Sequence, residues 1–142
     1  MGTAAVGWAS LHTAFAQTLP EELATAVRGF TAGATPRTGR VTLEIAQLVD
    51  NGNTVPLSVS VDSPMTVADH VTAIAIFNER NPQREVAQFT LGPRAGKAQV
   101  ATRIRLATSQ KLVAVARLSD GSFWQHQVDV IVTLAACIEG EA

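Results

Sequence analysis

Apolar and polar side chains alternate along Val55-Pro-Leu-Ser-Val-Ser-Val61, and the same period of two runs through Val41-Thr-Leu-Glu-Ile45 before it. Successive side chains of a β-strand point to opposite faces, so this alternation predicts strands with one buried face. Residues 71–77 (Val-Thr-Ala-Ile-Ala-Ile-Phe) are apolar at every position but one, which is typical of a strand buried on both faces. Further strand-like runs, separated by short turn signals, cover residues 86–91, 99–106, 111–118 and 123–134.

These runs make about seven strands, and no helical crossover lies between them. Parallel strands need such crossovers, so the pattern favours an all-β, antiparallel, Ig-like β-sandwich. The Cys…Trp…Cys signature of antibody domains is absent, so the inference extends to the architecture alone.

One short amphipathic helix is predicted ahead of the strands. The capping-box spacing Thr18-x-x-Glu21 marks its start, and Gly29 and Gly33 mark its end. Apolar residues repeat at helical spacing at Leu23, Ala26, Val27 and Phe30.

Composition limits the class of protein. The 142 residues suit one domain, and 46% hydrophobic against 16% charged residues excludes a disordered chain. Eleven Lys and Arg against twelve Asp and Glu give a net charge of −1, which excludes a strongly basic nucleic-acid binder. A single cysteine excludes an internal disulfide framework and a cysteine metal cluster.

The two ends of the chain differ from the body. Residues 1–16 are apolar and close with Ala14-x-Ala16, so they resemble the tail of an export signal, with an ordinary flexible N-terminus as the alternative. An export signal would place the mature protein outside the cytoplasm, and the segment is too short to span a bilayer. Residues 17–134 form the predicted sandwich domain, and residues 135–142 form a C-terminal arm that carries Cys137.

The chain shows no catalytic constellation. His12, His70 and His126 share no metal-ligand spacing. His12 falls in the segment that resembles an export signal, and we expect His70 and His126 to be surface or turn residues. No set of residues supplies an acid, a base and a nucleophile together, so an independent enzyme is the least supported function.

Basic residues concentrate in one part of the sequence. From Arg80 to Arg117 there are eight basic residues and one acid. Arg103 and Arg105 share one face of a predicted strand, with Ile104 and Leu106 on the other. This face is either a contact for an anion or an acidic partner, or a solvated surface that keeps an exposed edge from aggregating.

Cys137 is the remaining candidate for chemistry. Free cysteines are often small buried hydrophobes. Cys137 lies beyond the last predicted strand, on a short tail of small residues, where it is expected to be an accessible thiol.

Several blocks of the sequence resemble one known family. The runs Thr102-Arg-Ile-Arg-Leu-Ala-Thr-Ser-Gln110 and Val113-Ala-Val-Ala-Arg-Leu-Ser-Asp-Gly121 are similar to SoxY, the sulfur-carrier subunit of the bacterial thiosulfate-oxidising (Sox) system. The resemblance covers about residues 20–137 and includes Asn51-Gly-x-x-Val55-Pro56, Val61-Asp-Ser-Pro-Met65 and Asn81-Pro82.

The resemblance implies a periplasmic carrier that is not itself an enzyme and holds no cofactor or metal. It implies an Ig-like sandwich paired with a SoxZ-like subunit, itself a β-sandwich, and it implies Cys137 as the residue to which substrate is attached. It further implies three successive partners: a c-type cytochrome complex that conjugates thiosulfate to the thiol, a sulfate-releasing hydrolase, and a molybdenum-containing sulfane dehydrogenase.

The arm departs from the family pattern. The family ends Gly-Gly-Cys-Gly-Gly, whereas Cys137 follows Ala135 and Ala136. Alanine restricts the backbone angles that glycine allows. After the cysteine, the acidic residues Glu139 and Glu141 would repel an anionic adduct, so a non-carrier binding or scaffold subunit with a degenerate arm is the alternative function. The residues after the cysteine are Ile138, Glu139, Gly140, Glu141 and Ala142.

Overall fold

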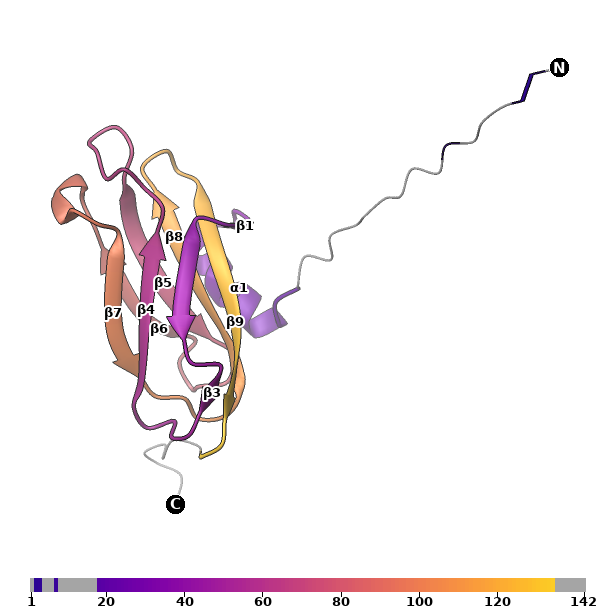
Figure 1. Ribbon diagram of the computed structural model, residues 1–142, viewed down its shortest axis with the longest axis vertical. Coiled ribbons are helices and arrows are strands. Elements are labelled where there is room, and N and C mark those ends of the chain that lie inside the picture. The colour runs from indigo at the N-terminus through magenta and orange to yellow at the C-terminus, as the bar shows by residue number, and fades with distance from the viewer. Residues whose placement is uncertain (1, 4–6, 8–17, 135–142) are drawn as a thin grey trace.

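The computed structural model describes residues 2–3, 7 and 18–134, and in these ranges the chain forms two β-sheets and one α-helix (Figure 1). The elements follow one another as α1 (Glu21–Thr31), β1 (Arg37–Thr38), β2 (Val41–Ile45), β3 (Leu48–Val49), β4 (Val55–Val61), β5 (Val71–Asn78), β6 (Glu85–Thr90), the 3-10 helix η1 (Pro93–Ala95), β7 (Gln99–Ile104), β8 (Gln110–Leu118) and β9 (Phe123–Val132).

The two sheets pack face to face as a sandwich, which confirms the predicted all-β architecture. The larger sheet has the strand order β1-β9-β8-β5-β6, with β3 also paired to β9, and the smaller sheet has the order β2-β4-β7. All pairings among the longer strands are antiparallel, whereas β1 and β3 run parallel to β9. The chain from β1 to β3 therefore crosses from the larger sheet to the smaller one and back.

The core lies between the sheets and follows the sequence alternation. On β4, Leu57 and Val59 face inward and are almost fully buried, while the intervening side chains face water. They meet Ile74, Ile76 and Leu112 of the larger sheet in one apolar cluster. β5 is buried on both faces, as its apolar sequence predicts, because the helix covers its outer side.

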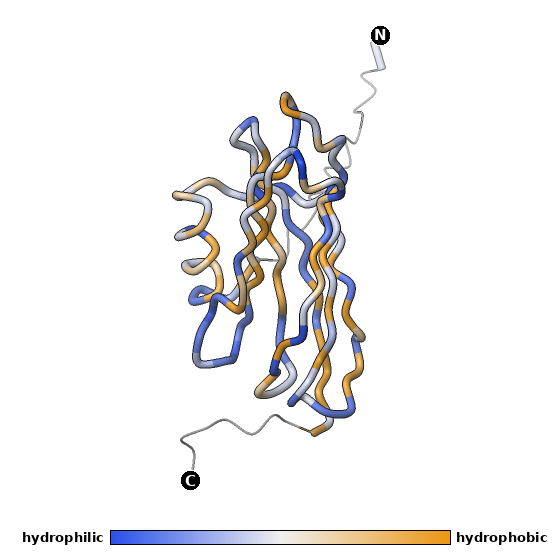
Figure 2. The backbone as a smooth tube through the Cα atoms, turned by 90° about the vertical axis from the view of Figure 1, so that its left-hand side faces the viewer, coloured by the Kyte–Doolittle hydropathy of each residue, from blue (hydrophilic) through white to orange (hydrophobic). Residues whose placement is uncertain are grey.

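Helix α1 packs on the outer face of the larger sheet, on the left in Figure 2. Leu23 and Val27 are buried against Phe77 and its neighbours. Phe30 adds ring contacts to Phe77 and to Phe123, with centroids 6.1 and 5.8 Å apart. In the described ranges no helix has the length and apolar character needed to cross a membrane.

Both ends of the helix differ from the sequence prediction. Pro20 is the N-cap residue, so the helix begins at Glu21 and Thr18 lies too early to form the capping box. At the other end the helix continues through Gly29 to Thr31. It stops where Ala32 and Gly33 turn into the left-handed region, with φ of 54° and 90°.

The tight turn between β8 and β9 contains Asp120 and Gly121 and lies between the two predicted strand runs 111–118 and 123–134. Gly121 has φ of 84°, which a glycine adopts without steric cost. The Asp120 carboxylate accepts hydrogen bonds from the Ser122 hydroxyl at 2.6 Å and the Ser122 N–H at 2.8 Å. These bonds, with a smaller contribution from the charge of Arg40, hold the pKa of Asp120 below its ordinary value of 3.8.

Candidate functional site

The end of the sandwich where β9 stops carries the candidate site, at the bottom in Figure 1. The last two described residues are bonded to β3 and to the turn that follows it. The Thr133 N–H donates to the carbonyl of Val49 at 3.0 Å, and the Leu134 carbonyl accepts from the Gly52 N–H at 2.8 Å. The point at which the C-terminal arm leaves the sandwich is thus fixed.

The same turn connects this point to the segment that follows β7 of the smaller sheet. The Gly52 carbonyl accepts a hydrogen bond from the Leu106 N–H at 2.8 Å. Leu134, Gly52 and Leu106 therefore form a row of hydrogen-bonded neighbours across the end of the sandwich. Each such neighbour is about 5 Å from the next, so the root of the arm lies about 10 Å from the residue beside Arg105.

Arg103 and Arg105 are both exposed, while Ile104 and Leu106 between and after them are buried. This confirms the predicted separation of the two faces, although β7 ends at Ile104 and Arg105 lies just beyond it. Both arginines line a shallow hollow of about 360 Å³, opposite the Asn81–Gln83 loop. Among the described residues, no carboxylate forms an ion pair with either guanidinium.

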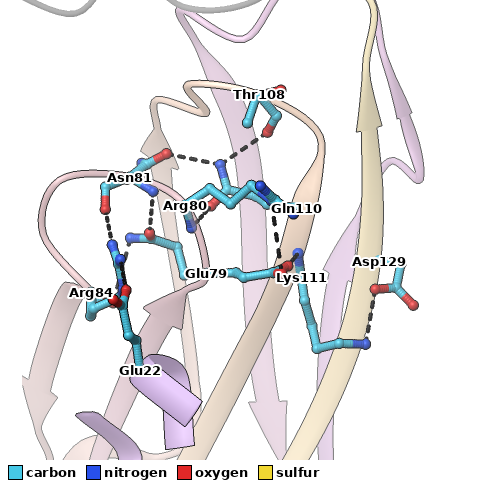
Figure 3. A network of polar contacts seen from close by, with 10 residues as sticks. Glu22, Glu79, Arg80, Asn81, Arg84, Thr108, Gln110, Lys111 and Asp129 are labelled. Carbon is cyan, nitrogen blue, oxygen red and sulfur yellow. Dashed lines mark hydrogen bonds and ion pairs between the residues drawn. The ribbon is translucent and has the colours of Figure 1, made fainter. Parts of the chain in front are cut away.

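A network of polar side chains fixes the loop opposite the arginines (Figure 3). The Asn81 side chain donates to the Arg105 carbonyl at 2.7 Å and accepts from the Ala107 N–H at 3.0 Å and from Gln110 Nε2 at 2.8 Å. Arg84 joins the same loop to helix α1 through an ion pair with Glu22. The backbone that carries Arg105 is therefore held in place by a residue 24 positions away.

In the sequence, Asn81 was noted only within the Asn81-Pro82 pair, and Gln110 was not singled out. The sequence does hold a signal for Gln110, because it is a polar residue at the start of an apolar strand. In the structure Gln110 is 5% exposed, and its amide oxygen accepts a hydrogen bond from the Arg80 N–H at 3.0 Å. Buried polar side chains are nearly always hydrogen-bonded, so such a residue predicts a partner, though not which one.

Exposed apolar side chains surround the root of the arm. Leu48, Ile131 and Leu134 are 60–61% exposed, and Leu48 is paired with Ile131 in the β3–β9 ladder. The end of the sandwich thus combines free guanidinium groups with exposed apolar side chains close to where the arm begins.

The histidines play different parts. His12 lies outside the described residues. The His70 ring bonds the Thr66 carbonyl at 3.0 Å within a loop, as expected of a turn histidine. The expectation for His126 was wrong: it is a half-buried residue inside β9, and its Nδ1 accepts the Leu43 N–H at 2.9 Å. In the described part of the chain, no three His, Cys, Asp or Glu side chains are grouped as metal ligands.

Cys137 and the arm residues Ala135, Ala136, Ile138, Glu139 and Gly140 lie outside the described residues, as do most of residues 1–16. The structure thus describes the end of the sandwich from which the arm starts.

By its fold, the protein belongs to the class of small β-sandwich proteins that carry one helix on the outer face of a sheet. The sequence from residue 27 to residue 137 matches the family model described as "Sulfur oxidation protein SoxY". The chain therefore belongs to the SoxY family, as the resemblance predicted, and the match ends at Cys137.

Solved structures show the same fold. The sulfur carrier protein SoxY from Chlorobium limicola f thiosulfatophilum has a TM-score of 0.64 and 24% identity over 76% of this chain and 89% of that one. Superoxide reductase (neelaredoxin) from Ignicoccus hospitalis has a TM-score of 0.60 and 16% identity over 66% and 80%. A putative superoxide reductase from Thermotoga maritima has a TM-score of 0.57 and 20% identity over 72% and 89%. Comparison with curated protein sequences gives no match.

Proposed function

We propose that this protein carries thiosulfate-derived sulfur, bound covalently to Cys137, and presents it to the enzymes of a Sox system. The observation that carries the proposal is that the family match runs through to the chain's single cysteine. The described sandwich ends three residues before that cysteine, at a root bonded to β3 and to the turn that follows it.

The chemistry needs only the thiol of this chain. A Cys137 thiolate and the sulfane sulfur of thiosulfate form an S–S bond, and the two electrons released pass to the c-type cytochrome complex. Water then cleaves the terminal S–S bond: the hydrolase releases sulfate and two protons, and a persulfide stays on Cys137. A sulfane dehydrogenase then oxidises that remaining sulfur with oxygen from three water molecules to a –S–SO₃⁻ group, releasing six protons and passing six electrons to a cytochrome acceptor, and hydrolysis of this group frees a second sulfate and the thiol. The scaffold supplies the position of the thiol and no acid or base of its own.

The hydrogen bonds of Thr133 and Leu134 support a fixed starting point for the C-terminal arm, and the short arm limits how far the Cys137 thiol can move from it. Three extended residues beyond Leu134 span about 10 Å, so the thiol stays near the end of the sandwich. Arg103 and Arg105 lie at the same end and favour an anionic adduct, whereas Glu139 and Glu141 disfavour it. We propose that a SoxZ-like β-sandwich is the partner subunit and that the pair works in the periplasm, after removal of residues 1–16 as an export signal.

The test is an intact-protein mass spectrum of the full chain with its SoxZ-like partner, after incubation with thiosulfate and the cognate cytochrome complex. A mass increase of one thiosulfate-derived –S–SO₃⁻ group is expected, and it should be absent in Cys137→Ala. The matched control is Cys137→Ser, which keeps the size of the side chain and should also stay unmodified. Absence of the adduct under conditions that load a Gly-Gly-Cys-Gly-Gly relative would refute the carrier function.

The arm sequence favours a second candidate function, a binding or scaffold subunit that carries nothing. Ala135 and Ala136 stand where the family has glycines, and two acids follow the cysteine. This function predicts that the Cys137 thiol is inaccessible, so an alkylating reagent added to the folded protein should leave it unmodified. Under the carrier function the same reagent should modify Cys137 completely.

A further inference from the structure

Two arginines share one tryptophan ring at the start of β9. The guanidinium carbon of Arg40 lies 5.0 Å from the centre of the Trp124 ring, and that of Arg37 lies 5.7 Å from it. Both arginines are exposed, and Trp124 is half-buried. An indole ring attracts a cation placed over its face, so the ring holds both side chains in place while their charges stay in water. We call Arg37, Arg40 and Trp124 the arginine–tryptophan stack.

The backbone at Arg40 is strained. The Val41 N–H donates to the Gly39 carbonyl at 2.6 Å, and Arg40 between them has φ of 59°. A three-residue turn with a positive φ at its centre is rare and strained, and a glycine at that position would adopt the conformation without steric cost. Strained residues cluster at binding and active sites, so this turn draws attention to the stack as a site.

The tryptophan ring is fixed on two sides. Its Nε1 atom donates to the Ser122 hydroxyl at 3.1 Å. The backbone of Gly39 passes so close that a Cβ atom at this position would lie 3.4 Å from Cζ3 of the ring. The stack is therefore ordered before anything binds to it, and a ligand loses little affinity to the ordering of these side chains.

The guanidinium groups of the stack have unused hydrogen-bond donors. Among residues 18–134, neither Arg37 nor Arg40 has a side-chain hydrogen bond or an ion pair. Two acids lie near Arg40 and weaken its charge without occupying it. The Asp120 carboxylate interacts with the charge of Arg40 but accepts its hydrogen bonds from Ser122, and Asp62 is bonded to the Arg40 carbonyl through its backbone N–H at 2.9 Å.

We propose that the arginine–tryptophan stack is a docking site for an acidic segment of a partner protein, whose carboxylates bind Arg37 and Arg40. A guanidinium presents its N–H groups in a fork that matches a carboxylate. The two guanidinium carbons lie over one ring and are thus at most about 11 Å apart. Two carboxylates on the same face of an extended segment start about 7 Å apart and can meet both groups.

The open position of the stack favours a protein segment over a free anion. Exposed ion pairs in water are weak. A partner that covers the surface excludes water and strengthens them, whereas a small anion leaves them in water. Tryptophan and arginine are also the residues that most often dominate the affinity of protein interfaces.

The stack lies at the opposite end of β9 from the root of the arm (Figure 1). Trp124 and Val132 are eight residues apart along the strand, which corresponds to about 26 Å. A partner held at the stack therefore leaves free the end of the sandwich from which the arm starts. The inference does not depend on the proposed carrier function, although for a carrier it would separate docking from delivery of the cargo.

The test follows the NMR signal of the Trp124 indole N–H in the full chain carrying Trp8→Phe, which leaves one tryptophan. The probe is a hexaglutamate peptide, and the uncharged control is hexaglutamine. At about 10 mM salt, where the Debye length is about 30 Å, hexaglutamate should shift the signal saturably and hexaglutamine should not. The apparent affinity should fall about tenfold in Arg37→Gln/Arg40→Gln, and about as much at about 1 M salt.

The matched control is Arg103→Gln/Arg105→Gln, which removes the same charge at the other end of the sandwich and should change the affinity less than about twofold. An affinity that is unchanged in Arg37→Gln/Arg40→Gln, or that falls equally in the control, would overturn the proposal.

Two further results would assign the stack to another occupant and would also overturn the proposal. One is sodium sulfate binding as tightly as hexaglutamate, which would indicate a free anion. The other is a dimer in analytical ultracentrifugation that is lost in Arg37→Gln/Arg40→Gln, which would indicate a second copy of the chain. None of these results bears on loading of Cys137, which the mass spectrum tests separately.

Discussion

The Nδ1 atom of His126 accepts a hydrogen bond from the backbone N–H of Leu43, and this bond joins β9 of the larger sheet to β2 of the smaller one. Among the described strands, β2 and β9 are not paired by backbone hydrogen bonds. The Leu43 N–H therefore has the His126 side chain as its acceptor in place of a backbone carbonyl. An imidazole nitrogen accepts only when it carries no proton, so the bond requires the tautomer with its proton on Nε2.

Replacing this histidine should destabilise the fold. Leu43 is 3% exposed, so His126→Phe leaves a buried N–H without its acceptor. We expect the free energy of unfolding in urea to fall by about 1–3 kcal/mol. The control is His70→Phe, which removes a bond to the carbonyl of Thr66 in an exposed loop and should cost about 0.5 kcal/mol or less. Equal losses in the two variants would contradict a special role for His126.

Two leucines give a matched test of the helix packing. Leu23 is fully buried between α1 and the larger sheet, whereas Leu48 is 61% exposed. Leu23→Ala should lower the free energy of unfolding by about 2–5 kcal/mol, because it removes buried methyl groups and leaves a cavity. Leu48→Ala should change it by about 0.5 kcal/mol or less. A small effect at Leu23, measured by urea titration, would show that α1 adds little to stability.

The Asn81 network should stabilise the loop at the end of the sandwich. Asn81→Ala removes three hydrogen bonds of that side chain, and we expect a loss of about 2–3 kcal/mol in the free energy of unfolding. Amide hydrogen exchange should quicken at Ala107, whose N–H loses its acceptor. Gln99→Ala, at an exposed position on β7, is the control and should leave exchange at Ala107 unchanged. Unchanged exchange in Asn81→Ala would contradict the network.

Asp120 should make stability depend on acid pH. Its pKa is lowered in the folded protein, mainly by the hydrogen bond from the Ser122 hydroxyl. A lowered folded pKa contributes stability above the unfolded value, and that contribution is lost as the pH falls through the folded pKa. We therefore expect the difference in thermal unfolding midpoint between wild type and Asp120→Asn to shift against wild type as the pH drops below about 4.

Ser122→Ala provides the matched control for this effect. It removes the donor with the largest influence and should raise the pKa of Asp120, followed by NMR titration of its side-chain carboxyl carbon. A titration curve identical to that of wild type would show that the Ser122 hydroxyl has no influence on Asp120.

The long strands were predictable because each buries one face or both, and burial leaves a period of two or a continuous apolar run. β1 and β3 were not predictable, since a two-residue strand has no period. Their pairing depends on β9, which follows some 80 residues later in the chain. The buried face of the helix was predicted from Leu23 and Val27. The first residue of the helix was not, because Pro20 keeps an extended conformation and the helix starts only after it, at Glu21.

The candidate site was predictable in part. The alternation of Arg103 and Arg105 with buried neighbours follows from sequence spacing alone. Their surroundings do not, because Asn81, Gly52 and Leu134 reach this end from three distant segments. His126 was misjudged for a similar reason: its acceptor role depends on β2 of the other sheet, 83 residues away.

The position of β9 decides how the protein responds when its C-terminus is pulled. This strand is bonded along one side to β8 and at its last residues to β3, and the carbonyl of Leu134, two residues beyond it, is bonded to Gly52. Tension applied through the arm runs along the strand axis, so the cross-strand bonds resist it together in shear and are not unzipped one at a time. Under the proposed carrier function, a partner that pulls on the arm would therefore come off before the sandwich unfolded.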